Sequence, residues 1–269
     1  MKKIAFYVNN GKVGADDVRN MLARHARRIG MAIAASPAEA DAVVVLGGDG
    51  TMLNAVHAFP GVPLLGLNLG ALGFLAGVEE PAFKSAIKAL KTGDYTLSAR
   101  TMLEWSTPGA CAADVMHDAL NEIVVSRGVS GHAASIDLAV DGSHATRFSA
   151  DGLVIATPTG STAYSLAAGG PILMPDTQAF VVTPICPHAL SSRPVVVRDS
   201  SRFTITAHIR DGESLAVFAD GAPVARLGEG ECLDVAKASS RATLIELAGC
   251  NPYRVLSRKL GWSGSAVFK

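Results

Sequence analysis

A glycine-rich turn with a single carboxylate is the first segment of this chain whose residue types suggest chemistry. It consists of Gly47, Gly48, Asp49, Gly50 and Thr51. Glycines allow backbone N–H groups to approach a phosphate closely, and a helix N-terminus adds a field that favours anions. The charge of Asp49 repels phosphate, so this carboxylate suits a general base or part of a metal site. The alternative is structural, with Asp49 acting as a helix cap.

The turn matches neither of two common nucleotide-binding loops. No Gly-Lys-Ser/Thr follows it, so it is not a Walker A loop, and its glycines do not fit GxGxxG. The pentapeptide therefore indicates a phosphate-binding turn without identifying the ligand.

A second polar feature, Asn121-Glu122, stands before the apolar run Ile123 to Val125. Asn offers a donor and an acceptor, whereas ionised Glu only accepts. Together the two side chains are suited to gripping the hydroxyls of a ribose. Taken in isolation, the dipeptide is more typical of a polar strand end.

The third feature is the segment DGLVIATPTGSTAYSLAAGGP, residues 151 to 171. An expected strand, Leu153 to Ala156, ends in a turn rich in hydroxyls, and a short helix is expected at 163–168. Tyr164 offers an aromatic face and a hydroxyl, and Asp151 is a further acceptor. A tightly turned core connection is the alternative, but the density of hydroxyls favours a polar ligand.

The first third of the chain alternates strand and helix patterns. Strands are expected at 4–8, 42–46 and 63–68, and helices at 15–29, 51–58 and 81–90. Repeated βα units predict a parallel, Rossmann-like sheet. Ligands bind at the carboxyl ends of such strands, where the glycine-rich turn lies.

Short β runs separated by turn residues dominate from about residue 95. Residues 136–140 and 144–148 flank Asp141-Gly142, a strong hairpin signal. Further runs lie at 195–197, 203–209, 214–218, 232–236 and 243–247. These patterns predict an antiparallel, β-sandwich-like second domain. The expected division is 1–95 for the α/β domain and 96–252 for the mostly β domain, with a helix and tail at 253–269 packing back on the first.

Composition limits the possible functions. The chain has 24 Lys and Arg residues and 24 Asp and Glu residues. It therefore lacks the basic excess that is typical of a general nucleic-acid binder. Four widely spaced cysteines without a CxxC pair favour reduced thiols over a zinc site or a disulfide framework. The most membrane-like run, 62–78, contains Pro63, Asn68 and four glycines, which favours a strand and turn. We expect a cytoplasmic protein without a nucleic-acid or membrane partner.

Taken together, GGDGT, the NE pair and the DG…TPTGSTAY…GGP block closely resemble the NAD kinase family, in this order and at similar separations. Further similar segments lie at 68–75, 184–188, 192–194, 220–221 and 259–262, so the resemblance spans residues 42 to 262. GGDGT alone is shared with lipid kinases and phosphofructokinases, whereas the TPTGSTAYS block is far more specific.

The resemblance implies transfer of the ATP γ-phosphoryl group to the 2′-hydroxyl of the adenosine ribose of NAD, giving NADP. It also implies a divalent metal, usually Mg²⁺, and a homodimer or homotetramer. Asp49 resembles the family's proton acceptor, Gly50 would lie along the NAD diphosphate, and Asn121 and Glu122 would hold ribose hydroxyls. Other implied contacts are Asp151 and Cys186 on the nicotinamide side, Phe74 near the adenine, Thr162, Ala163, Tyr164, Ser165, Leu166 and Ala167 along the NAD pocket, and Asn54 and His132 as ligand contacts.

Two departures concern fine substrate preference. Many bacterial relatives have Ser at the position of Ala167, and a Gln is frequent at the position of Ala222. Two other functions stay open: a GGDGT kinase acting on a lipid or a sugar phosphate, and a non-catalytic NAD-binding regulator. The TPTGSTAY block weighs against the first, and the carboxylate of Asp49 weighs against the second. Ligand contacts and structural roles both remain open for His188 and Arg193.

Overall fold

The computed structural model describes residues 1–9, 11–108, 117–128, 133–209 and 213–262. The chain forms two compact units, and each is described by itself. The first unit combines the two ends of the chain, Met1–Ala99 and Ala242–Lys269, and the second is Arg100–Arg241. The domain boundaries expected from the sequence stay a prediction.

The first unit contains a parallel sheet with the order β2-β1-β3-β4. Its strands are β1 (Lys3–Val8), β2 (Ala32–Ile33), β3 (Ala42–Gly47) and β4 (Leu64–Asn68). Every residue of β3 is buried, as the run of valines predicted. This arrangement confirms the Rossmann-like sheet.

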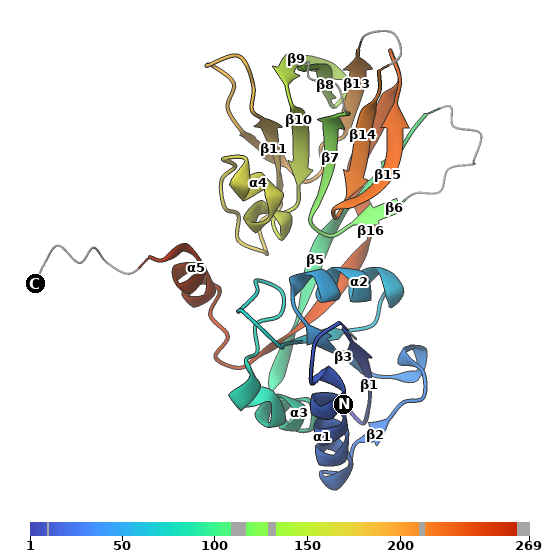
Figure 1. Cartoon of the computed structure of the whole chain (residues 1–269), viewed down its shortest axis with the longest axis vertical. Helices are drawn as coiled ribbons and strands as arrows, with labels where there is room; N and C mark the ends of the chain where they lie inside the picture. Colours follow the sequence, from blue (N-terminus) through green and yellow to red (C-terminus); the bar gives the residue numbers. More distant parts are fainter. Residues whose placement is uncertain (10, 109–116, 129–132, 210–212, 263–269) are drawn as a thin grey trace, which may run out of the picture. The chain divides into compact units, whose positions relative to one another are not determined.

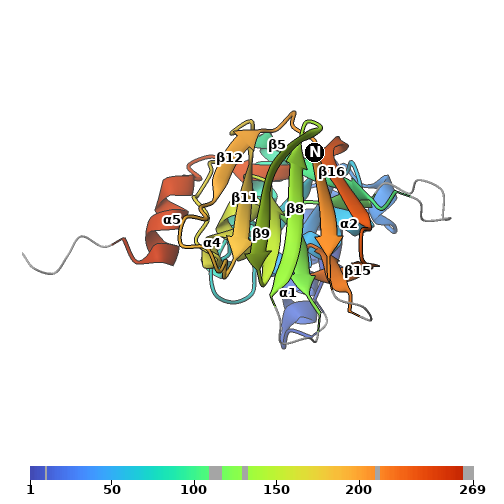
Figure 2. The same cartoon turned by 90° about the horizontal axis from the view of Figure 1, so that it is seen from above.

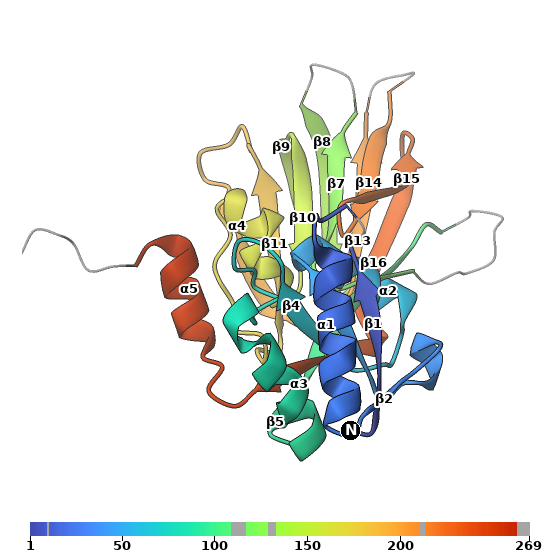
Figure 3. The same cartoon turned by 60° about the horizontal axis from the view of Figure 1, so that its bottom comes forward.

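Helices cover both faces of this sheet (Figure 3). On one face, α1 (Ala15–Arg28) and α3 (Phe83–Thr92) share an apolar core with Leu65 and Leu67 of β4. Gly66 points to the opposite face, where a Cβ would lie 2.9 Å from the sulfur of Met52. That face is therefore packed by α2 (Asp49–Ala58), which follows β3 directly. A fourth helix of the first unit, α5 (Pro252–Leu260), begins after Asn251, whose side chain caps it.

Helix α2 begins two residues earlier than the sequence pattern predicted. Its N-cap is Gly48, and the hydroxyl of Thr51 accepts a hydrogen bond from the Gly48 N–H at 3.3 Å. The side chain of the third helical residue thus satisfies an N–H group that the helix itself leaves without a partner. Asp49 is the first residue of the helix and not its cap.

The second unit contains a six-stranded antiparallel sheet with the order β12-β11-β10-β7-β14-β15 (Figure 1). The strands are β7 (Glu122–Arg127), β10 (Gly152–Ala156), β11 (Ala179–Ile185), β12 (Val195–Arg198), β14 (Leu215–Ala219) and β15 (Ala222–Leu227). Val124, Val154 and Val181 form an apolar cluster on one face of this sheet. Residues that follow the short helix α4 (Tyr164–Ala167), among them Ala168 and Leu173, pack against this cluster.

A second antiparallel layer contains β8 (Ala134–Val140), β9 (Ser143–Ala150), β13 (Phe203–His208) and the first part of β16 (Cys232–Leu247). β5 (Tyr95–Ser106) and β6 (His117–Ala119) pair beside it through Leu103 and Ala119. Buried side chains from both layers form one core, in which the rings of Phe180 and Phe203 lie 6.2 Å apart. The predicted β-sandwich-like architecture is confirmed.

Two Asp-Gly turns connect hairpins in the second unit. Asp141 and Gly142 have φ angles of 51° and 76°, and they join β8 to β9 as predicted (Figure 2). Asp220 and Gly221 have φ angles of 48° and 80°, and they join β14 to β15. Positive φ at both central positions is the conformation that closes a two-residue hairpin with the correct twist.

The strands expected at 232–236 and 243–247 are one continuous strand, β16. Its end does not continue the antiparallel pattern, because Leu244 pairs in parallel with Leu64 of β4 in the first unit. The sequence pattern identified the strand correctly, but its partner is more than 170 residues away in the chain. Within the described ranges, the structure contains no helix long and apolar enough to cross a membrane.

Candidate functional site

Asp49 lies two residues after the last residue of β3, at the carboxyl end of the parallel sheet. Its carboxylate accepts hydrogen bonds from three successive backbone N–H groups: Phe74 at 2.8 Å, Leu75 at 2.9 Å and Ala76 at 3.1 Å. An ionised carboxylate has about four lone-pair positions, so these bonds leave roughly one position on Oδ2. The side chain is therefore fixed in place with limited remaining capacity to accept a proton or a hydrogen bond.

The loop that holds Asp49 depends on a glycine. A Cβ on Gly73 would lie 1.9 Å from Oδ1 of Asp49, which is closer than any two non-bonded atoms approach. Gly73 therefore permits the backbone to close around the carboxylate. The sequence pattern gives no sign of this contact, although Gly73 belongs to one of the segments that carry the family resemblance.

The glycines of the GGDGT turn have different surroundings. A Cβ on Gly47 would lie 2.2 Å from the buried hydroxyl of Thr51, so Gly47 and Thr51 pack against each other within the fold. Added Cβ atoms on Gly48 and Gly50 would meet nothing within 4 Å. Open backbone suited to a ligand is therefore found at Gly48 and Gly50, and not at Gly47.

Two further predicted residues of the first unit have ordinary surroundings. Asn54 is exposed on α2. The ring of Phe74 is partly buried, and the ammonium group of Lys259 in α5 lies 5.4 Å from its centroid. A second contact of α5 is the ion pair between Arg258 and Glu79, at 2.9 Å.

Asn121 and Glu122 are almost completely buried in the second unit, with exposed fractions of 9% and 6%. Glu122 is the first residue of β7 and pairs with Ala156 of β10. Its Oε2 atom has no hydrogen-bond partner within the described part of the chain. Burial and, to a smaller extent, the charge of Asp220 raise the pKa of Glu122 to about 7, against the effect of the Tyr164 backbone N–H. A carboxyl group with this pKa is partly protonated at neutral pH, so Glu122 can donate a hydrogen bond as well as accept one.

Most hydroxyls of the TPTGSTAY block serve the fold itself. Thr157 donates to the Leu120 carbonyl at 2.6 Å, Ser161 donates to the Pro158 carbonyl at 2.7 Å, and Ser165 and Thr183 share a hydrogen bond of 2.9 Å. This finding corrects the interpretation of the hydroxyl density, because these buried groups already have partners. The partly buried Thr162 hydroxyl donates to the Thr159 carbonyl at 3.2 Å, and Tyr164 is 45% exposed at the surface of the block.

Of the other predicted residues in this block, Ala163 and Leu166 are partly buried, and Ala167 is exposed. Asp151 precedes β10 and forms an ion pair of 3.1 Å with Arg127 at the end of β7. Arg127 was not identified from the sequence, because its partner Asp151 is distant in the chain and precedes a neighbouring strand. Cys186 is exposed, and its φ angle of 44° is unusual for a residue other than glycine. His132 lies outside the described residues.

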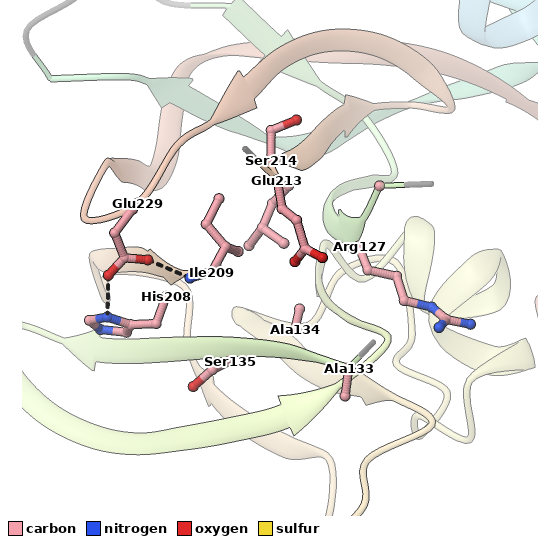
Figure 4. Close-up of a pocket in the computed structure, with 11 residues that line it drawn as sticks. Arg127, Ala133, Ala134, Ser135, His208, Ile209, Glu213, Ser214 and Glu229 are labelled. Atoms are coloured by element: carbon pink, nitrogen blue, oxygen red, sulfur yellow. Dashed lines mark hydrogen bonds and ion pairs between the residues drawn. The ribbon is translucent and has the colours of Figure 1, made fainter. Parts of the chain in front are cut away.

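The second unit also contains a cavity of about 460 Å³ (Figure 4). Its lining includes Arg127, His208, Glu213 and Glu229, and Glu229 interacts with the His208 ring at 3.5 Å and with the backbone of Ile209. None of the described substrate residues expected from the sequence lines this cavity. In the second unit, Asn121 and Glu122 lie at the Ala156 end of β10, whereas Asp151 and Cys186 lie at its Gly152 end.

Comparisons with known proteins match both parts of the chain to domain models of one family. Residues 4–95 match the model of the ATP-NAD kinase N-terminal domain, and residues 120–247 match that of the ATP-NAD kinase C-terminal domain. The NAD kinase of Syntrophotalea carbinolica is 38% identical over 84% of this chain and 80% of its own length. The NAD kinase of Methylibium petroleiphilum is 41% identical over 83% of this chain and 75% of its own length.

Solved structures agree with the sequence comparisons. Yeast NADH kinase in complex with NADH has a TM-score of 0.88 and 26% identity, and the match covers 100% of this chain and 90% of that one. An NAD kinase from Archaeoglobus fulgidus in complex with ATP has a TM-score of 0.78 and 26% identity, with coverages of 96% and 98%. The chain therefore belongs to the NAD kinase family.

Proposed function

We propose that this protein transfers the γ-phosphoryl group of ATP to the 2′-hydroxyl of the adenosine ribose of NAD, giving NADP and ADP. The observation that carries this proposal is the family similarity, which extends over 84% of the chain at 38% identity and includes both domain models. The protein is accordingly a phosphotransferase that uses ATP.

We propose Asp49 as the proton acceptor. In the reaction, the 2′-oxygen forms a bond to the γ-phosphorus while the bond from that phosphorus to the bridging oxygen of ADP breaks, and the hydroxyl proton passes to a base. Phosphoryl transfer depends mainly on positioning and on neutralisation of charge. The three backbone N–H groups that fix the Asp49 carboxylate support this role, since a base must be held in a constant position.

Substrate contacts are proposed in both units. In the second unit, Asn121 and Glu122 hold ribose hydroxyls, and their burial supports a rigid contact. In the first unit, the open backbone at Gly50 supports its place along the NAD diphosphate. The remaining proposed contacts are Asn54 and Phe74 from the first unit, and Asp151, Thr162, Ala163, Tyr164, Ser165, Leu166, Ala167 and Cys186 from the second.

The proposal includes a divalent cation, with Mg²⁺ as the expected one. The described residues contain no group of three His, Cys, Asp or Glu side chains able to hold a metal ion. Mg²⁺ commonly binds through substrate phosphates, waters and only one or two carboxylates. Such an ion neutralises the charge on the transferring phosphoryl group. We assign no residue as its ligand.

Self-association as a homodimer or homotetramer, and a cytoplasmic location, complete the proposal. The oligomeric state rests on the family resemblance, and the location rests on the wide cysteine spacing and on the interrupted apolar run at 62–78. Sedimentation velocity of the purified protein measures the oligomeric state directly, and a monomer at all concentrations would contradict it.

The deciding experiment is an assay of NADP formation with purified protein, NAD, ATP and Mg²⁺, run in parallel with polyphosphate and other nucleotides as donors. We expect NADP to form with ATP. ATP turnover with diacylglycerol but not with NAD would identify a lipid kinase. NAD binding without NADP formation under any of these conditions would identify a regulator.

A further inference from the structure

The turn between β14 and β15 contacts the segment that contains Asn121 and Glu122. Oδ2 of Asp220 accepts a hydrogen bond from the Leu120 N–H at 2.8 Å. Oδ1 accepts from the N–H groups of Asn121 at 2.7 Å and Glu122 at 3.3 Å. In the opposite direction, the Asp220 N–H donates to the Glu122 carbonyl at 3.1 Å. Two segments about 100 positions apart in the chain are thus joined by four hydrogen bonds.

The chemistry of this contact favours an aspartate. Three successive backbone N–H groups that converge on one point form a site for an anion, and a carboxylate accepts such bonds more strongly than a neutral group. Asp220 also has a φ angle of 48°, in the left-handed region that Asp and Asn tolerate better than most residues. Asp therefore suits both the turn and the contact.

The other side of the same segment is fixed by the TPTGSTAY block. The Thr157 N–H donates to the Asn121 carbonyl at 2.9 Å, and the Thr157 hydroxyl donates to the Leu120 carbonyl. A Cβ on Gly160 would lie 2.0 Å from the Asn121 carbonyl oxygen. Residues 120–122 are held between Asp220 and the 157–160 turn, so the side chains of Asn121 and Glu122 project from a backbone with little freedom.

Burial has the largest effect on the pKa of Glu122, and Asp220 adds to that effect. Helix α4 contributes the backbone N–H of Tyr164, and β10 contributes the apolar side chain of Ala156. Asp220 contributes a negative charge, which opposes ionisation of the Glu122 carboxyl. The positional and the electrostatic effects come from the same side chain.

We infer that Asp220 is a positioning residue of the proposed NAD site, which fixes the backbone of Asn121 and Glu122 through its hydrogen bonds and adds a negative charge beside the buried Glu122 carboxyl. The inference rests on the proposed function only in naming NAD as the ligand. Asp220 acts through its two neighbours and has no assigned contact with the substrate.

The first test compares Asp220→Asn with Asp141→Asn. Both variants lose one charge in an Asp-Gly hairpin turn of the second unit, but the Asp141 carboxylate binds Arg198 and Arg202 instead of residues 120–122. Asp220→Asn places an NH₂ group or a weaker acceptor against three N–H donors. We expect its KM for NAD to rise about 10-fold, with a smaller change in kcat. Asp141→Asn should leave both values within about twofold of the wild type.

The pH dependence separates positioning from a purely structural effect. Removal of the Asp220 charge lowers the pKa of Glu122. The pH at which ionisation of Glu122 changes kcat/KM for NAD should therefore be lower in Asp220→Asn than in the wild type. Asp220→Glu retains the charge and should keep the wild-type pH profile even if its KM rises. A profile for Asp220→Glu that is shifted as far as that of Asp220→Asn overturns the inference.

A titration without substrates keeps the test independent of activity. Carboxyl ¹³C NMR of protein labelled at Glu follows Glu122, whose signal is assigned by its loss in Glu122→Gln. We expect the midpoint to fall in Asp220→Asn and to stay constant in Asp141→Asn. An unchanged midpoint in Asp220→Asn overturns the inference even if the protein forms NADP, and a lowered midpoint supports it even if the wild type forms none.

Discussion

Two carboxylates of this protein have opposite surroundings, and their expected roles differ accordingly. Asp49 accepts three backbone hydrogen bonds, which fix its orientation. Glu122 is buried with one oxygen lacking a partner among the described residues, and its pKa is raised to about 7. Enzymes commonly assign different tasks to carboxylates by placing them in different surroundings. Here we expect a proton acceptor at Asp49 and a hydrogen-bond donor at Glu122.

Asp49→Asn tests the proposed base. A positioned general base contributes on the order of 10²- to 10⁴-fold to the rate, so kcat should fall by at least about 100-fold. Steady-state kinetics measure this loss, and calorimetry of NAD binding should show little change. Near-normal kcat would exclude Asp49 as the base. Since Asn also places an NH₂ group near the N–H groups of residues 74–76, the fold of the variant must be checked by circular dichroism.

Gly73→Ala tests the loop separately from the carboxylate. The new Cβ would overlap Oδ1 of Asp49, so we expect a loss of about 1–3 kcal/mol in the free energy of unfolding and a lower kcat. Gly77→Ala is the matched control, because its Cβ would meet nothing within 4 Å. Urea unfolding and steady-state kinetics on both variants measure the two effects. Equal behaviour of the two variants would show that the close approach at Gly73 is unimportant.

Glu122→Gln tests the raised pKa through stability. The folded-state pKa of about 7 exceeds the unfolded value of 4.5, so the stabilising effect of protonation is complete below pH 4.5 and is lost as the pH rises through 7. The difference corresponds to about 3 kcal/mol. The variant lacks this titration, so its stability relative to the wild type should be higher at pH 8 than at pH 5. Urea unfolding at both pH values measures the difference in free energy of unfolding between the variant and the wild type. A difference that is the same at both pH values would contradict the raised pKa.

At the scale of elements, the hydroxyl-rich block acts first as a structural connection. Its buried hydroxyls bind carbonyl groups and, at Ser165, the Thr183 hydroxyl of β11. A Cβ on Gly170 would lie 2.3 Å from the Ser165 hydroxyl. This packing supports the segment 120–122 from one side, while the β14–β15 turn supports it from the other. The proposed ribose contacts thus depend on elements that are distant in the sequence.

Ser165→Ala tests this structural role. The change leaves the buried hydroxyl of Thr183 without its partner from Ser165 at 2.9 Å, so we expect a loss of about 1–3 kcal/mol in the free energy of unfolding. Tyr164→Phe removes a hydroxyl from a neighbouring residue that is 45% exposed, and it should change stability by less than about 0.5 kcal/mol. Thermal unfolding of both variants distinguishes them. A stable Ser165→Ala variant with impaired NAD binding would instead indicate direct ligand contact.

At the scale of the whole molecule, the chain builds its first unit from both ends and its second from the middle. β16 continues from the second unit into the first, where Leu244 pairs with Leu64. Both units match domain models of one family. Their matched ranges, together with relatives covered over about 80% of their length, assign the activity to the chain as a whole and not to one segment.

The sequence alone determined the local elements, the fold class and the family. Apolar runs, helical periodicity and Asp-Gly turns are local signals, so β1, β3, α1 and the β8–β9 hairpin agreed closely with expectation. Tertiary structure decided which backbone groups meet each side chain. The N–H groups of residues 74–76 at Asp49 and the carboxylate of Asp220 at residues 120–122 come from distant segments. Such contacts follow from strand pairing and packing, and the sequence pattern around each residue carries no information about them.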